Sequence, residues 1–168
     1  MCRHLSLPEN KIRYRNTLSH FPTGVAIVTC CTPEGDPVGM TINSFCSISL
    51  TPALVGWCID RKANSYLHFA RAREFSITFL SATQEAIAQR FATRGADKFQ
   101  DIFCIPHIPP VIQGGTAWLQ CTTDRTLLVG DHLMIIGQVF DFEQSNRRPL
   151  VFSEGKFNQL SHHLNQAA

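Results

Sequence analysis

The fold is decided by the stretch Gly39-Met40-Thr41-Ile42-Asn43-Ser44-Phe45-Cys46-Ser47-Ile48-Ser49-Leu50-Thr51-Pro52. Apolar and polar residues alternate over its first half, and this period of two predicts a half-buried β-strand. The polar positions carry small hydroxyl and amide side chains. Such groups, with backbone N–H groups at a strand end, can hydrogen-bond a flat ring or a phosphate. The same pattern also fits the solvent face of an edge strand and its turn, and the residues alone leave both interpretations open.

Length and charge narrow the class of protein. The 168 residues fit one domain over 1–168, with a loose arm over 1–8 and a tail over 161–168. The formal charge is +2 and the basic residues are scattered, so neither nucleic acid nor an anionic membrane is an expected partner. No apolar run reaches the roughly 18 residues of a membrane span, and the N-terminus lacks the plan of a signal peptide. We therefore expect a cytoplasmic protein.

Several kinds of site have no motif in this chain. Seven cysteines show no CxxC spacing, which favours small core residues over a zinc ribbon or a disulfide framework. HExxH is absent, so no metal is expected, and GxSxG is absent too. Neither GxGxxG nor GxxxxGK[ST] occurs, so a nucleotide would have to be held by a site that is neither a Rossmann fold nor a P-loop.

The periodicity along the chain predicts a mainly β protein. We expect strands over residues 25–31, 38–45, 54–59, 74–80, 117–128, 132–143 and 150–152. We expect three helices, one over 9–21, a short one that follows the turn 60–65 and ends at about residue 72, and one over 84–93. The helices are few and short and lie between strands that follow one another through turns. This order favours an antiparallel β-barrel with peripheral helices over a doubly wound parallel sheet.

Two turns carry polar residues that suggest a role. The basic turn 60–65 leads into a short helix, where Asn64 or Ser65 can serve as N-cap, and such a turn is either an anion site or an ordinary solvated loop. Gly130-Asp131 between two apolar arms predicts a tight hairpin, because glycine readily adopts positive φ. His132 follows directly, and taken alone it fits a half-exposed residue at a strand start.

Three blocks of the chain resemble the short-chain flavin reductase family: Phe21–Thr29, Asn43–Pro52 and Gly130–His132, in that order and spacing. The resemblance runs from about Tyr14 to Leu160. It implies an FMN-binding split β-barrel of antiparallel Greek-key type and a homodimer. It also implies transfer of a hydride from NADH or NADPH to FMN or FAD. A separate flavin-dependent monooxygenase would then use the reduced flavin.

The same resemblance implies roles for individual residues. The flavin ring would be lined by Met40, Thr41, Asn43 and Ser44, with Trp57 and Cys58 close by. Its phosphate would face Lys62, Asn64 and Ser65, and the site would be closed by Lys98 and Phe99. The nicotinamide would contact Thr23, His132, Lys156 and Phe157, with His132 as the catalytic residue that orients the ring.

The chain departs from the family pattern at three places. Cys46 stands where threonine is usual, Ser153-Glu154 replaces a basic pair, and Phe157 replaces a frequent tyrosine. The last two departures favour an alternative, in which the barrel is a non-enzymatic flavin-binding or haem-binding module. A third possibility is an interaction domain whose polar strand is only surface.

Overall fold

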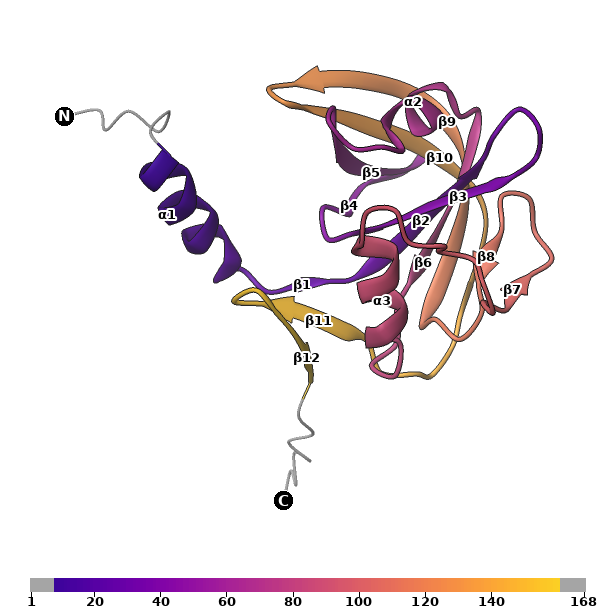
Figure 1. Cartoon of the computed structure of the whole chain (residues 1–168). Helices are drawn as coiled ribbons and strands as arrows, with labels where there is room; N and C mark the ends of the chain where they lie inside the picture. The colour runs from indigo at the N-terminus through magenta and orange to yellow at the C-terminus, as the bar shows by residue number, and fades with distance from the viewer. Residues whose placement is uncertain (1–7, 161–168) are drawn as a thin grey trace.

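The structure, a computed structural model, describes residues 8–160 and consists mainly of antiparallel strands (Figure 1). The strands are β1 (Thr23–Gly24), β2 (Ala26–Cys31), β3 (Pro37–Ile42), β4 (Cys46–Leu50), β5 (Ala53–Asp60), β6 (Glu74–Phe79), β7 (Cys104–Ile105), β8 (Val111–Ile112), β9 (Ala117–Val129), β10 (His132–Gln144), β11 (Leu150–Ser153) and β12 (Lys156–Gln159). The predicted mainly β, antiparallel class is confirmed. The expected arm over 1–8 and tail over 161–168 lie outside the described residues, except that Pro8 begins a helix.

The main sheet has seven strands in the order β3-β2-β6-β9-β10-β5-β4. Its two edge strands, β3 and β4, are consecutive in the chain and are joined only by residues 43–45. Four residue steps span at most about 14 Å, so the end of β3 must lie near the start of β4. The sheet therefore curls into a barrel that stays split between these two strands, as predicted.

The deciding stretch thus contains two strands rather than one. The predicted strand 38–45 ends at Ile42, and Cys46–Leu50 forms the separate edge strand β4, which pairs with β5. The alternation is interrupted at the connection, where Asn43 and Ser44 are both polar and Phe45 and Cys46 are both apolar, but a local pattern of this kind does not show with which strand each half pairs. The chain changes its pairing partner there, and only the other strands of the sheet define that partner.

The long hairpin of β9 and β10 is the largest paired unit, and it is confirmed as predicted. Gly130 has φ of 60° at its tip. A register shift between Ile136 and Gly137 bends the pair around the barrel. Inside, Trp57 packs edge-on against Phe69 and Phe75, with ring centroids 5.0 and 6.0 Å apart, and these rings fill the core.

Residues 8–160 contain three helices, α1 (Pro8–Ser19), α2 (Tyr66–Arg71) and α3 (Glu85–Ala92), of which α2 and α3 pack on the barrel. Helix α2 inserts Phe69 into the barrel core, and α3 packs Ala88 and Phe91 on the other face of β2 and β3. Helix α1 buries no residue and stands away from the barrel, beside the small sheet β1-β11-β12 (Figure 1). Within residues 8–160, none of the helices has the length and hydropathy needed to cross a membrane.

Gly137 tests the packing that closes the hairpin against the core. A Cβ at this position would lie 2.8 Å from Phe75 Cε1 and 2.9 Å from Cys121 Cβ, and both of these residues are buried. We expect Gly137→Ala to lower the free energy of unfolding by about 1–3 kcal/mol, measured by urea denaturation. Gly24→Ala is the control, since a Cβ there meets nothing within 4 Å. Equal stabilities of the two variants would contradict this packing.

Candidate functional site

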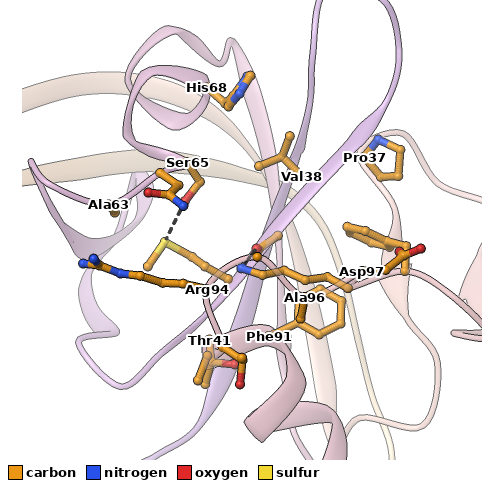
Figure 2. Close-up of a pocket in the computed structure, with 18 of the residues that line it drawn as sticks. Pro37, Val38, Thr41, Ala63, Ser65, His68, Phe91, Arg94, Ala96 and Asp97 are labelled. Atoms are coloured by element: carbon orange, nitrogen blue, oxygen red, sulfur yellow. Dashed lines mark hydrogen bonds between the residues drawn. The ribbon is translucent and has the colours of Figure 1, made fainter.

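A cavity of about 540 Å³ lies beside the edge strand β3, and we call it the edge-strand cavity. Its walls are β3, the turn before α2, the end of α3 and the loop that follows α3 (Figure 2). It is lined by Pro37, Val38, Gly39, Met40, Thr41, Asp60, Ala63, Asn64, Ser65, His68, Phe91, Ala92, Thr93, Arg94, Gly95, Ala96, Asp97, Lys98 and Phe99. The edge strand β3, which forms one side of the split in the barrel, therefore forms a wall of the cavity.

The backbone of β3 turns hydrogen-bonding groups toward this cavity. Lys98 Nζ donates to the Gly39 carbonyl at 3.0 Å, which shows that this carbonyl faces the open edge. Along an antiparallel strand, alternate residues point their N–H and C=O groups to the same side. The N–H and C=O of Thr41 therefore also face the edge, where no strand within residues 8–160 pairs with β3. Such a row of donors and acceptors matches the edge of a flat heterocycle.

Two aromatic rings cover the strand beside these groups. Phe91 from α3 and Phe99 from the following loop pack edge-on, with centroids 5.1 Å apart. A Cβ on Gly39 would lie 2.6 Å from Phe91 Cε1 and 3.2 Å from Phe99 Cζ. Only glycine lets both rings approach the backbone this closely, so the cavity has an apolar wall next to an exposed strand edge.

The hydroxyl of Thr41 is not available to the cavity. Its Oγ1 donates to the Ala88 carbonyl at 2.6 Å and so joins β3 to α3. Thr41 lines the edge-strand cavity, in keeping with its predicted place at the site. Its side-chain hydroxyl, however, stabilises the packing of α3 on β3. A ligand at this position would find the backbone of Thr41.

The turn before α2 presents donors from the opposite wall. Tyr66 N–H donates to the Ala63 carbonyl, and Ala63 N–H donates to that of Asp60. Among residues 8–160, the backbone N–H groups of Asn64 and Ser65 have no acceptor. The Ser65 hydroxyl donates only to Met40 Sδ at 3.6 Å, a weak acceptor, and it does not cap the helix. This turn can therefore receive an oxyanion.

The carboxylates in the cavity already have partners. Asp60 Oδ1 accepts the Lys62 N–H at 2.8 Å, and Asp97 Oδ1 accepts the Gln100 N–H at 3.3 Å. Burial lowers the pKa of Lys98, whose ammonium group reaches the Gly39 carbonyl. The cavity therefore combines an apolar wall with a cation at the strand edge, and its two acids are held by local turns.

Two further cavities lie at the other end of β3 and share Phe21, Thr23 and Asn43. One, of about 440 Å³, is mostly apolar and includes Phe45 and Phe79. The other, of about 700 Å³, lies against α1. Thr23 Oγ1 is buried without a hydrogen-bond partner, so a polar ligand atom could satisfy it there.

The residues predicted for a flavin fall into separate groups. The edge-strand cavity contains Met40, Thr41, Asn64, Ser65, Lys98 and Phe99. Asn43 lines the two other cavities, and Lys62 is exposed outside all three. Ser44 Oγ donates to the Cys58 carbonyl at 3.2 Å and accepts its N–H at 3.0 Å. The Ser44 hydroxyl therefore holds the connection between β3 and β4 against β5.

Trp57 and Cys58 also lie away from the edge-strand cavity. The side chain of Trp57 is 0% exposed in the barrel core, and its Nε1 has no hydrogen-bond partner. The side chain of Trp57 lines none of the three cavities, because β5 turns this position inward, and its place close to a flavin stays a prediction. Cys58 lies on the outer side of β5, where burial and the neighbouring Cys46 raise the pKa of its thiol.

The four residues predicted for a nicotinamide do not meet within one chain. Figure 1 shows the tip of the β9–β10 hairpin at the top of the molecule and β12, with Lys156 and Phe157, at the bottom. Phe157 packs against Phe152, with ring centroids 5.5 Å apart. Thr23 is on β1, which pairs with β11.

His132 lies nearer to the edge-strand cavity. It pairs in register with Asp60, which lines that cavity, and cross-strand neighbours have Cβ atoms about 5 Å apart. Its Nδ1 lies 2.7 Å from Asp131 Oδ1, and this hydrogen bond lowers the pKa of the exposed Asp131 carboxyl. The hydrogen bond orients the imidazole at the tip of the hairpin.

The lining residues that were not predicted from the sequence include Gly39, His68, Phe91 and Arg94. Phe91 has the spacing of an ordinary core residue on α3, and Gly39 is the second residue of the predicted strand 38–45. Arg94 begins the basic, glycine-containing loop that ends at Lys98 and Phe99. The basic composition of that loop is the feature of the sequence from which Arg94 could have been predicted as a lining residue.

Comparison with known proteins agrees with this geometry. Residues 18–161 match the family model described as the flavin reductase like domain. The chain is 40% identical over 162 residues to an FMN reductase (NADH) from Agrobacterium fabrum, and the match covers 94% of this chain and 92% of that protein. A solved NADH:FAD oxidoreductase from Streptomyces globisporus, in complex with NAD and FAD fragments, has a TM-score of 0.88 at 31% identity, covering 97% of this chain and 100% of that chain.

A further relative is longer than this chain. The reductase component of a flavin-dependent trigonelline monooxygenase from Acinetobacter baylyi is 36% identical over 151 residues. The match covers 88% of this chain and 49% of the relative, so this chain spans about half the length of that protein.

The structural role of the Thr41 hydroxyl can be measured directly. Thr41→Val keeps the shape of the side chain and removes the hydrogen bond to Ala88, so we expect the free energy of unfolding to fall by about 1 kcal/mol. Thr126→Val is the matched control, since Thr126 is an exposed strand residue. Urea denaturation of both variants checks this. An unchanged stability of Thr41→Val would show that the hydroxyl does not hold α3 on β3.

Proposed function

The chain belongs to the family of flavin reductase-like domains, and from this premise we propose that it is an NAD(P)H-dependent flavin reductase. It would transfer a hydride from NADH or NADPH to FMN or FAD. The observation that carries the proposal is the edge-strand cavity, where the unpaired backbone of β3 meets an apolar aromatic wall. This combination suits an isoalloxazine ring, which has an apolar benzenoid end and a polar pyrimidine edge.

The residues present fit a flavin in this cavity. The backbone of Gly39 and Thr41 would hydrogen-bond the polar edge of the ring, and Lys98 would stand next to it as a cation. Asn64 and Ser65 would bind the phosphate through their unpaired N–H groups. The bound flavin supplies the hydride acceptor, and the protein supplies position and electrostatics. That division of roles explains why no acid–base pair is needed among the lining residues.

For the nicotinamide we propose contacts with His132, Thr23, Lys156 and Phe157. His132 would orient the ring or its carboxamide, since it is half-exposed opposite Asp60 and its imidazole is hydrogen-bonded to Asp131. Thr23 would contribute its unpartnered hydroxyl. The relatives named for NADH favour NADH as donor, and the acidic side chain of Glu154 near α1 agrees with that choice, because a carboxylate disfavours the extra phosphate of NADPH.

A single assay separates the proposed enzyme from its rivals. Purified protein is mixed with NADH or NADPH and with free FMN or FAD, and the near-ultraviolet absorbance of the reduced nicotinamide is followed. We expect oxidation that depends on added flavin. A protein that binds flavin without oxidising either nicotinamide would instead be a binding module, and a protein that does neither would be an interaction domain.

His132 provides a test of the nicotinamide site. We expect His132→Ala to raise KM for NADH about tenfold, equivalent to about 1.4 kcal/mol, while the Kd for flavin stays within a factor of two. Steady-state kinetics and flavin fluorescence titration measure the two quantities. His107→Ala is the control, since His107 packs at a tilt against Trp118 and lines none of the three cavities. Equal losses of nicotinamide use and flavin affinity would remove the proposed role.

We further propose a homodimer. Helix α1 exposes Ile12, Tyr14 and Leu18, and the ends of β4 and β9 expose Leu50 and Leu128. Exposed apolar side chains in such number are typical of an interface. Sedimentation at micromolar concentration should show a stable dimer, and a monomer would contradict this proposal.

The proposal also covers the domain organisation, the partner enzyme and the location of the protein in the cell. The chain would act as one domain over 1–168 and deliver reduced flavin to a separate monooxygenase, as the name of the trigonelline relative suggests for that protein. The cytoplasm is the proposed location, in keeping with unpaired cysteines such as Cys30 and Cys121 in the core.

A further inference from the structure

We propose that Arg94 binds the phosphate of the flavin and so makes the edge-strand cavity select phosphorylated flavins over riboflavin. This inference rests on the proposed function and assigns the phosphate recognition to a residue outside the family blocks. The ligand chemistry is a phosphate monoester, as in FMN, or the proximal phosphate of FAD.

The position of Arg94 is set by the end of α3. The helix ends at Ala92 with Thr93 as its C-cap, and the backbone N–H of Thr93 donates to the carbonyls of Gln89 and Arg90. Gly95 follows with φ of 73°, so the chain reverses and Arg94 begins a loop along the cavity. Figure 2 shows its side chain extending across the cavity toward Ala63 and Ser65 on the opposite wall. A group held between the two walls would meet the guanidinium on one side and the turn 63–65 on the other.

The guanidinium is available for a ligand. Within residues 8–160, Arg94 makes neither an ion pair nor a hydrogen bond, and its side chain is exposed. The two carboxylates of the cavity, Asp60 and Asp97, each accept a backbone N–H instead. A cation that faces a cavity without a carboxylate partner is suited to an anionic ligand.

The other basic groups nearby have different roles. Lys98 is committed to the Gly39 carbonyl at the strand edge, where the ring would lie. Arg90 donates to the Gln100 carbonyl at 2.7 Å, and Lys62 does not line the cavity. Arg94 is therefore the arginine placed to meet a phosphate at this mouth, and a guanidinium can do so through two parallel hydrogen bonds.

The opposite wall supplies a complementary donor. The Ser65 hydroxyl has only the weak sulfur acceptor of Met40, so it can turn to a phosphate oxygen at little cost. Arg94 and Ser65 would then hold one phosphate from two elements that are far apart in the sequence. Riboflavin lacks the phosphate and would gain nothing from either residue.

A comparison of two ligands isolates this role. The Kd of FMN and of riboflavin is measured by flavin fluorescence for the full-length protein, Arg94→Met and Arg94→Lys. We expect Arg94→Met to weaken FMN about tenfold or more, as for loss of a charged hydrogen bond, while riboflavin changes less than twofold. Arg94→Lys should recover part of the loss, since it keeps the charge but not the paired geometry.

Controls separate this proposal from a general defect. Arg73→Met removes an exposed arginine that lines none of the described cavities and should leave both affinities unchanged. FAD should follow FMN if its proximal phosphate is the group recognised. An equal loss of FMN and riboflavin affinity, or no loss of either, would overturn the role of Arg94 while the flavin site stands. Wild-type protein that binds none of the flavins would overturn the proposed function as well.

Discussion

The unpaired edge of β3 is the constraint on which the rest of the structure depends. The connection over residues 43–45 brings β3 and β4 together at one end, yet the strands do not pair, so the barrel remains split. An exposed edge of this kind ordinarily invites association with another strand. Here the turn before α2, the helix α3 and the loop 94–99 lie around this edge. Together they form a cavity in which the backbone donors and acceptors of β3 can meet a ligand.

Side-chain hydroxyls near the split mostly hold the fold, and the backbone is left for a ligand. Thr41 reaches α3, and Ser44 bridges to both backbone groups of Cys58. Each hydroxyl links two elements that border the opening, Thr41 linking β3 to α3 and Ser44 linking the connection after β3 to β5. A ligand bound to a strand edge held in this way meets groups that need little rearrangement, which is the condition for precise alignment of two reacting rings.

The charged residues of the cavity lie in different places and have different partners. Lys98 donates to a backbone carbonyl at the strand edge, and the side chain of Arg94 extends across the cavity. Asp60 and Asp97 each accept a backbone N–H from their own turn. His132 enters from another hairpin and is in register with Asp60. A site for two nucleotides can thus be assembled without a Rossmann fold or a P-loop, because loops between antiparallel strands carry the binding groups.

The sequence by itself determined the antiparallel class, most strand positions and the hairpin at Gly130, because alternation and turn residues act locally. The resemblance to a family predicted flavin contacts for Met40, Ser65 and Lys98, and these three residues line the edge-strand cavity. Only the tertiary structure decided that Trp57 points into the core, since its strand has apolar residues on both faces. It also decided that Arg94 crosses the cavity. Whether a side chain is buried, engaged or free depends on neighbours that distant segments bring to it, and no local pattern encodes them.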